Sequence, residues 1–183
     1  MKTHFSQIFW GLILVFLDFS INGLDLLFDG LGYLLIAIGC GGLSSSASRF
    51  AVARVLSLIL VLLWFVGFFV DRDLAGPYAL AMNVVNAVMV WQLLSGIAAF
   101  SQARGRHDLA NQAINRRLAY ALIQTVFIAT PYLFGNSREM APLAYPLVLA
   151  FLIIMVMILH LIYRVGASLV ESSDASDQVG SLA

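Results

Sequence analysis

Long apolar runs, separated by short polar segments, dominate the sequence. A helix that crosses a hydrocarbon core of about 30 Å needs roughly 20 mostly apolar residues, and four runs have about this length. Each run ends at charged residues or at helix breakers. The runs cover 50–70, 77–100, 118–134 and 143–163, and they predict four transmembrane helices.

The segment 5–43 is also apolar, but it is too long for one span. Its 39 residues would form a helix about 58 Å long, roughly twice the thickness of the hydrocarbon core. An Asn-Gly pair and an Asp-Gly pair divide this segment, because these residue types form turns. The sequence therefore predicts two further spans, near 5–21 and 27–43.

The apolar run after Lys2 resembles the start of a signal peptide, but no small-residue cleavage site follows it. We therefore expect a retained first span.

The distribution of Lys and Arg tests the six spans independently, because short cytoplasmic loops retain these residues. With the N-terminus inside, eight of the ten lie in cytoplasmic segments, and only Arg72 and Arg138 lie outside. A five-span alternative would give seven inside and three outside. We predict an all-α polytopic transmembrane helix bundle over 1–166, N-in/C-in, with a flexible polar cytoplasmic tail over 167–183.

The composition makes the lipid bilayer the expected surrounding of most of the chain. Hydrophobic residues make up 61% and charged residues 11%, with a mean hydropathy of +0.93. The net charge is zero and the sequence has no long basic run, so nucleic acid is excluded as a principal partner. The single cysteine, Cys40, can form neither an intrachain disulfide nor a cysteine-based metal site.

Four polar residues at the outer ends of the first two spans, and in the turn that joins them, form the first candidate site. They are spaced by 4, 3 and 4 positions, so any helical path places them on one face. They are Asp18, Asn22, Asp25 and Asp29. Clustered oxygen ligands suit a proton, Mg²⁺ or Ca²⁺, which indicates an external cation or proton site. The structural alternative is that these residues cap helices or reach the headgroups, with Asp29 as the N-cap of the second span.

Polar residues inside the fourth and fifth spans form the second candidate, a polar path. They are Asn83, Asn86, Gln92 and Gln124. The alternative is that they join helices through hydrogen bonds, which contribute about 0.6 kcal/mol each on average.

Anionic lipid is the expected partner of four arginines near the cytoplasmic side of the fifth span, since each gains about 1 kcal/mol near an anionic leaflet. They are Arg104, Arg106, Arg116 and Arg117. Gly32 and Gly39 share one side of the second span and permit close helix packing. Such packing would form within the chain, in a homo-oligomer or against a membrane-protein partner.

Enzyme motifs are absent from the sequence, including metalloprotease, serine hydrolase, P-loop and dinucleotide fingerprints. The three histidines lack ligand spacing, so we expect no metal, no cofactor and no enzymatic activity. A metal-dependent active site at the Asp18 to Asp29 group is the one exception that the residues leave open.

The stretch LDFSINGLDLLFDGLGYLL, from Leu17 to Leu35, carries Asp-Phe, Asn-Gly, Asp-Leu-Leu and Asp-x-x-Gly-Tyr in series. It resembles the opening of an uncharacterised family of small bacterial multipass membrane proteins, over about the first 45 residues. Members of that family commonly carry proline where this chain has Phe28. The resemblance implies a bacterial cytoplasmic membrane location and no particular activity.

Two functional hypotheses follow from the sequence. The first is transport or sensing of a small solute or ion through a compact helical bundle, with the acidic group at its external mouth. The second is a noncatalytic accessory or assembly subunit of a larger membrane complex.

Overall fold

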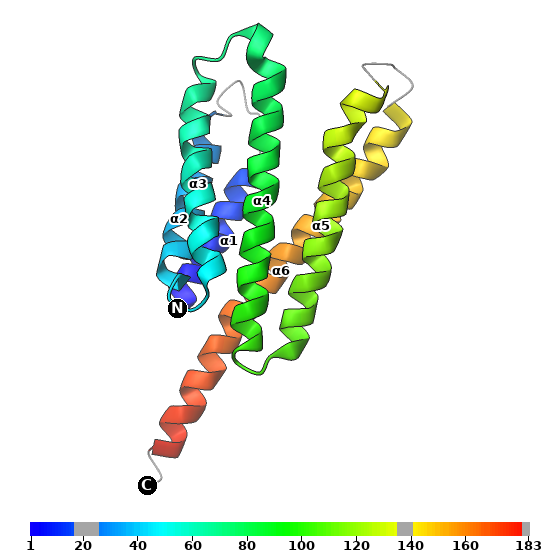
Figure 1. Ribbon diagram of the computed structural model, residues 1–183. Coiled ribbons are helices and arrows are strands. Elements are labelled where there is room, and N and C mark those ends of the chain that lie inside the picture. Colours follow the sequence, from blue (N-terminus) through cyan, green and yellow to red (C-terminus); the bar gives the residue numbers. More distant parts are fainter. Residues whose placement is uncertain (17–25, 135–140, 181–183) are drawn as a thin grey trace.

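The computed structural model describes residues 1–16, 26–134 and 141–180, and their regular structure is entirely helical. The predicted all-α class is therefore confirmed (Figure 1). The elements within these ranges are α1 (Lys2–Phe16), α2 (Leu26–Leu43), α3 (Ser48–Gly67), the short 3₁₀ helix η1 (Arg72–Leu74), α4 (Ala75–Gln102), α5 (His107–Phe134) and α6 (Ala141–Gly180).

Three helices in the described part of the chain are long and apolar enough to cross a membrane. These are α3, α4 and the segment Tyr145–Ser168 of α6. The apolar part of α2 is shorter, Asp29–Leu43, and α5 is polar over its first turns. The three apolar helices are those of a membrane-associated protein.

Each helix packs against its neighbours in sequence, and α6 returns to pack against α1. The contacts run from α1 through α2, α3, α4 and α5 to α6 and back to α1, so they form a closed circuit of helices. In Figure 1, α5 and the first part of α6 lie on the side of α4 away from α2 and α3, and α6 then crosses past α4 toward α1.

An aromatic cluster joins three helices at one end of the molecule. Phe5 of α1, Phe50 of α3 and Phe100 of α4 are each at most 1% exposed. Their rings pack edge to face, with centroids 5.2 to 6.4 Å apart, the geometry that the ring quadrupoles favour. The start of α1, the start of α3 and the end of α4 therefore meet at the same end of the bundle.

Most of the outward surface of α3 is apolar. Val55, Leu62 and Phe65 are all more than half exposed. An apolar stripe of this length would be costly in water, whereas lipid tails would cover it without penalty.

Helix α6 is longer than the predicted span near 143–163, because it continues to Gly180, into the predicted tail. No glycine or proline interrupts residues 167–179. A helix does not need to be apolar to continue, so hydropathy gave no sign of this extension.

Candidate polar groove between α4 and α5

A groove of about 440 Å³ lies between α4 and α5, in the middle of their lengths. Each helix contributes one stripe of side chains at helical spacing. The lining residues are Ala87, Val88, Trp91 and Gln92 from α4, with Ala121, Gln124, Thr125 and Ile128 from α5. The groove thus contains Gln92 and Gln124, two of the four residues of the predicted polar path.

Arg117 lies at one end of this groove, over Trp91. Its Cζ is 4.3 Å from the centroid of the Trp91 ring, a cation–π contact. Its Nη1 donates a hydrogen bond of 2.9 Å to Ser95 Oγ, while its buried Nε has no acceptor. A guanidinium with donor capacity to spare therefore stands at the groove.

Gln92 connects the groove to a second arginine. Arg49 Nη1 donates to Gln92 Oε1 over 3.1 Å. This bond engages the amide oxygen of Gln92, and its amide N–H groups remain to donate to a ligand.

On the opposite wall, Gln124 is 6% exposed, and the Thr125 hydroxyl donates to Ala121 O over 2.7 Å. The hydroxyl proton of Thr125 is thus used within α5, and the side-chain donors that this wall offers to a ligand are the amide N–H groups of Gln124.

The other two residues of the predicted path do not line the groove. Asn83 is exposed, and its Nδ2 donates to Ala79 O of its own helix over 2.8 Å. Asn86 is half-buried, and its buried Oδ1 has no donor. The four residues are thus not gathered in one place.

The predicted external site falls largely outside the described residues, since Asp18, Asn22 and Asp25 lie between 17 and 25. Asp29 is described, and it is half-buried in the first turn of α2. The interpretation of Asp29 as an N-cap is wrong, because α2 begins at Leu26, three residues earlier. Among the residues with described side chains, no three His, Cys, Asp or Glu groups could hold a metal ion together.

A separate polar cluster, which contains Arg106, Arg116 and Arg164, lies between α5 and α6. Gln112 Oε1 accepts from Arg116 Nη2 at 3.3 Å and from Arg164 Nη1 at 3.4 Å. Burial, and then the neighbouring Arg164, lower the pKa of Arg116. Asp108 lies 3.8 Å from Arg164 and 3.6 Å from Arg106. This acid is therefore engaged at the α5–α6 junction, and the α4–α5 groove has no acidic lining residue.

Sequence reasoning missed the parts that Trp91, Ser95 and Arg117 take in this groove. One signal was available, because Arg117 and Gln124 are seven positions apart, two helical turns on one face of α5. Trp91 and Ser95 stand one turn apart on α4 in the same way.

No protein-family model, curated protein or solved structure matches this chain.

Proposed function

We propose that this chain is a six-span integral membrane protein with both ends in the cytoplasm, and that it binds a small anionic or hydrogen-bonding solute in the α4–α5 groove. Binding there serves the transport or sensing of that solute. The observation that carries the proposal is the donor set at the groove, formed by the amides of Gln92 and Gln124 and the guanidinium of Arg117.

The sign of the local charge favours an anion over a cation. Arg117 and Arg49 both contact residues that line the groove, while none of these lining residues is acidic. In a medium of low dielectric constant, uncompensated guanidinium groups attract anions more strongly than in water.

The length of the groove fits access from the cytoplasmic side. Arg117 and Ile128 are 11 residues apart, or about 16 Å along the helix, roughly half of a 30 Å core. Arg117 directly precedes the apolar segment 118–134, so it is placed near the inner interface and the groove leads from there toward mid-membrane.

The orientation is supported by the basic residues at one end of the bundle. The start of α1, the turn at 44–47 and the turn at 103–106 lie at this end in Figure 1. Lys2, Arg49, Arg104 and Arg106 belong to these segments or adjoin them, which fits a cytoplasmic face. A bacterial cytoplasmic membrane is the location that we propose.

Anion binding can be tested by tryptophan quenching, with iodide as an anionic probe and caesium as a cationic one. The contribution of Trp91 is the difference between wild type and Trp91→Phe. We expect iodide to quench Trp91 more strongly than caesium does. Arg117→Gln should weaken iodide quenching at least fivefold, since a hydrogen bond to a charged group contributes roughly 1.5–3 kcal/mol.

Arg54→Gln is the matched control for this measurement, because Arg54 is an exposed arginine of α3 outside the groove, and it should leave the quenching unchanged. Equal quenching of Trp91 by iodide and caesium would overturn the proposed preference for anions.

Transport can be separated from sensing in proteoliposomes that carry gradients of nitrate, phosphate or acetate. Flux that Gln124→Leu abolishes would identify transport, and binding without flux would identify sensing. If no probe anion binds and a protein partner is recovered in fixed stoichiometry by native mass spectrometry, the accessory-subunit hypothesis replaces this one. The external acidic site stays a separate prediction, tested by the effect of Asp18→Asn on cation flux.

The topology can be tested with single cysteines introduced in a Cys40→Ala background. Ser45 and Ala103 are exposed in the turns at one end, and Gly76 is exposed at the other. Membrane-impermeant maleimide applied to whole cells should label Gly76→Cys and should not label Ser45→Cys or Ala103→Cys until the cells are opened. Labelling of Ala103→Cys in intact cells would overturn the N-in/C-in orientation.

A further inference from the structure

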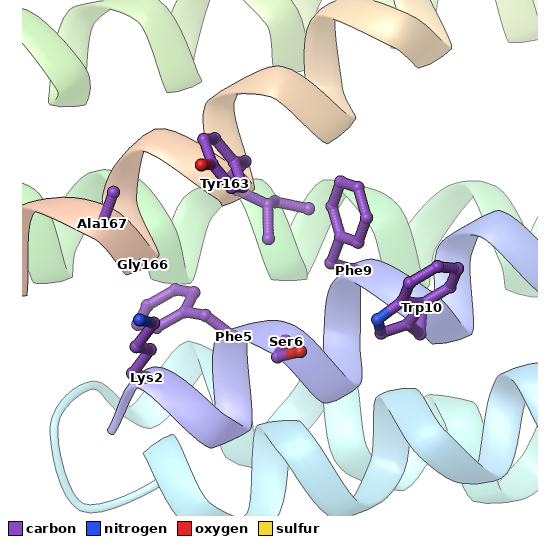
Figure 2. Close-up of a pocket in the computed structure, with 9 residues that line it drawn as sticks. Lys2, Phe5, Ser6, Phe9, Trp10, Tyr163, Gly166 and Ala167 are labelled. Atoms are coloured by element: carbon purple, nitrogen blue, oxygen red, sulfur yellow. The ribbon is translucent and has the colours of Figure 1, made fainter.

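A second groove, of about 450 Å³, lies between α1 and α6 and is mainly apolar. Figure 2 shows Lys2, Ser6 and Trp10 along α1, with Tyr163 and Ala167 across from them on α6. The lining residues are Lys2, Phe5, Ser6, Phe9, Trp10, Ile162, Tyr163, Gly166 and Ala167.

The groove has the length of a lipid chain in one leaflet. Lys2 and Trp10, at its two ends on α1, are eight residues apart, or about 12 Å along the helix. One leaflet occupies about 15 Å of a 30 Å core. The groove therefore covers most of the inner leaflet and stops short of the bilayer midplane.

Gly166 of α6 and Phe5 of α1 form the floor of this groove. Gly166 is buried, and a Cβ at this position would lie 3.3 Å from Phe5 Cβ. The missing side chain leaves room beside Phe5. The walls are apolar, with Phe9 on α1 and Ile162 on α6.

The cytoplasmic end of the groove is positively charged. Lys2 is the only residue with a permanent charge among the lining residues, and none of them is acidic. Arg104 adds a second cation near this end: its Nη2 lies 3.3 Å from Met1 Sδ, and its Cζ lies 3.6 Å above the ring of Phe100. Phe100 in turn packs against Phe5.

We propose that the α1–α6 groove binds one phospholipid with an anionic headgroup. An acyl chain lies along Phe9 and Ile162, the headgroup phosphate pairs with the Lys2 ammonium, and the Ser6 hydroxyl can donate to the glycerol ester. This site rests on the proposed membrane location, but it does not depend on the solute groove between α4 and α5.

The apolar walls of the groove and the positive charge at its cytoplasmic end together favour a phospholipid as the occupant. A hydrophobic helix from a partner would cover the apolar walls but would bring no anionic group to Lys2. A soluble anion would satisfy Lys2 but would leave the apolar walls open. A phospholipid meets both requirements, and its phosphate lies at the depth where Lys2 enters the membrane.

The full-length protein should be purified into nanodiscs that contain phosphatidylglycerol and phosphatidylcholine in equal amounts, and bound lipid counted by native mass spectrometry. We expect one phosphatidylglycerol to be retained in preference to phosphatidylcholine. Lys2→Gln should reduce this preference about fivefold, since a lysine near an anionic lipid contributes on the order of a factor of five in affinity. Arg54→Gln, which removes an exposed cation outside this groove, should leave it unchanged.

Two variants that fill the groove test acyl-chain binding separately from the contribution of the Lys2 charge. Ala167→Leu and Ser6→Leu, on opposite walls, should reduce the retention of both lipids. Equal retention of the two lipids by wild type, or unchanged retention in both Leu variants, would overturn the proposal. Recovery of a second protein chain in place of lipid would also overturn it.

Maleimide labelling of Gly76→Cys and Ala103→Cys, each combined with Lys2→Gln, tests membrane insertion separately from lipid binding. An unchanged labelling pattern would show that loss of lipid does not reflect loss of membrane insertion. Iodide quenching of Trp91 should also be unaffected in Lys2→Gln, because Lys2 is not part of the α4–α5 groove.

Discussion

Single glycines set the distance between α1 and α2. A Cβ at Gly32 would lie 2.6 Å from Val15 Cγ2 and 2.8 Å from the carbonyl oxygen of Gly11. At Gly39 it would lie 2.6 Å from His4 O. Since the contacts with Gly11 and His4 are to backbone oxygens, a change of rotamer cannot relieve them. The predicted close packing of Gly32 and Gly39 is therefore confirmed, and it occurs within the chain.

The first prediction is that Gly32→Ala destabilises the folded protein by about 1–3 kcal/mol, the usual cost of overpacking. The measurement is the thermal unfolding temperature in detergent. Gly76→Ala is the matched control, because a Cβ there has no atom within 4 Å. It should leave the unfolding temperature unchanged or raise it slightly. An unchanged unfolding temperature in Gly32→Ala would mean that α1 and α2 lie farther apart than the structure has them.

A second prediction at this scale concerns Cys40, which is 0% exposed. Because a thiol must be accessible as well as ionised to react, we expect no maleimide labelling of Cys40 in the folded protein. Full labelling should follow unfolding in dodecyl sulfate. Rapid labelling in the native state would contradict the packing of α2 against its neighbours.

Between elements, Gln112 lies at the α5–α6 junction together with the Asp108–Arg164 ion pair and a hydrogen bond from Arg116 Nη1 to Met157 O. Gln112 accepts hydrogen bonds from Arg116 and Arg164, and the two guanidinium groups repel each other. The third prediction is that Gln112→Leu loosens this junction and costs about 1–3 kcal/mol, because it removes two charged hydrogen bonds. Urea-dependent unfolding of the purified protein measures this cost.

Asn115→Leu is the matched control for the junction, since Asn115 is an exposed residue of the same helix. Its effect should be within about 0.5 kcal/mol, as for surface substitutions in general. A similar loss of stability in both variants would show that added apolar surface, and not the loss of the Gln112 hydrogen bonds, is responsible.

Hydropathy measures how apolar a segment is, so it predicts the apolar part of each helix and not its polar ends. Each predicted span overlaps a helix because the apolar runs report burial in lipid or core. The polar starts and ends of helices carry no such signal, so the extension of α6 from 167 to 180 was missed. The rotation of each helix about its axis is also invisible to hydropathy. Gln92 and Gln124 could therefore be identified as polar positions, but the stacking of Arg117 on Trp91 could not.

At the scale of the whole molecule, the contact between α1 and α6 closes the circuit of helices, and it joins the first helix to the last. The Cβ-to-Cβ separation at Phe5 and Gly166 would be 3.3 Å, close to the roughly 3.8 Å that is typical of disulfides. The last prediction is that Phe5→Cys combined with Gly166→Cys, in a Cys40→Ala background, forms an intrachain disulfide on mild oxidation.

A protease site inserted after Ala103 makes this disulfide visible, since cleavage there places Phe5 and Gly166 on different fragments. With the disulfide, the cleaved protein should migrate as one band without reductant and as two bands with it. Gly76→Cys with Gly166→Cys is the control, because these positions also fall on different fragments. Gly76 lies in the first turn of α4, whereas Gly166 lies beside Phe5, which packs against Phe100 at the other end of α4, so this pair should always give two bands. Disulfide-linked dimers in place of the single band would mean that α1 meets α6 of another copy, so the circuit of helices would close between chains and not within one.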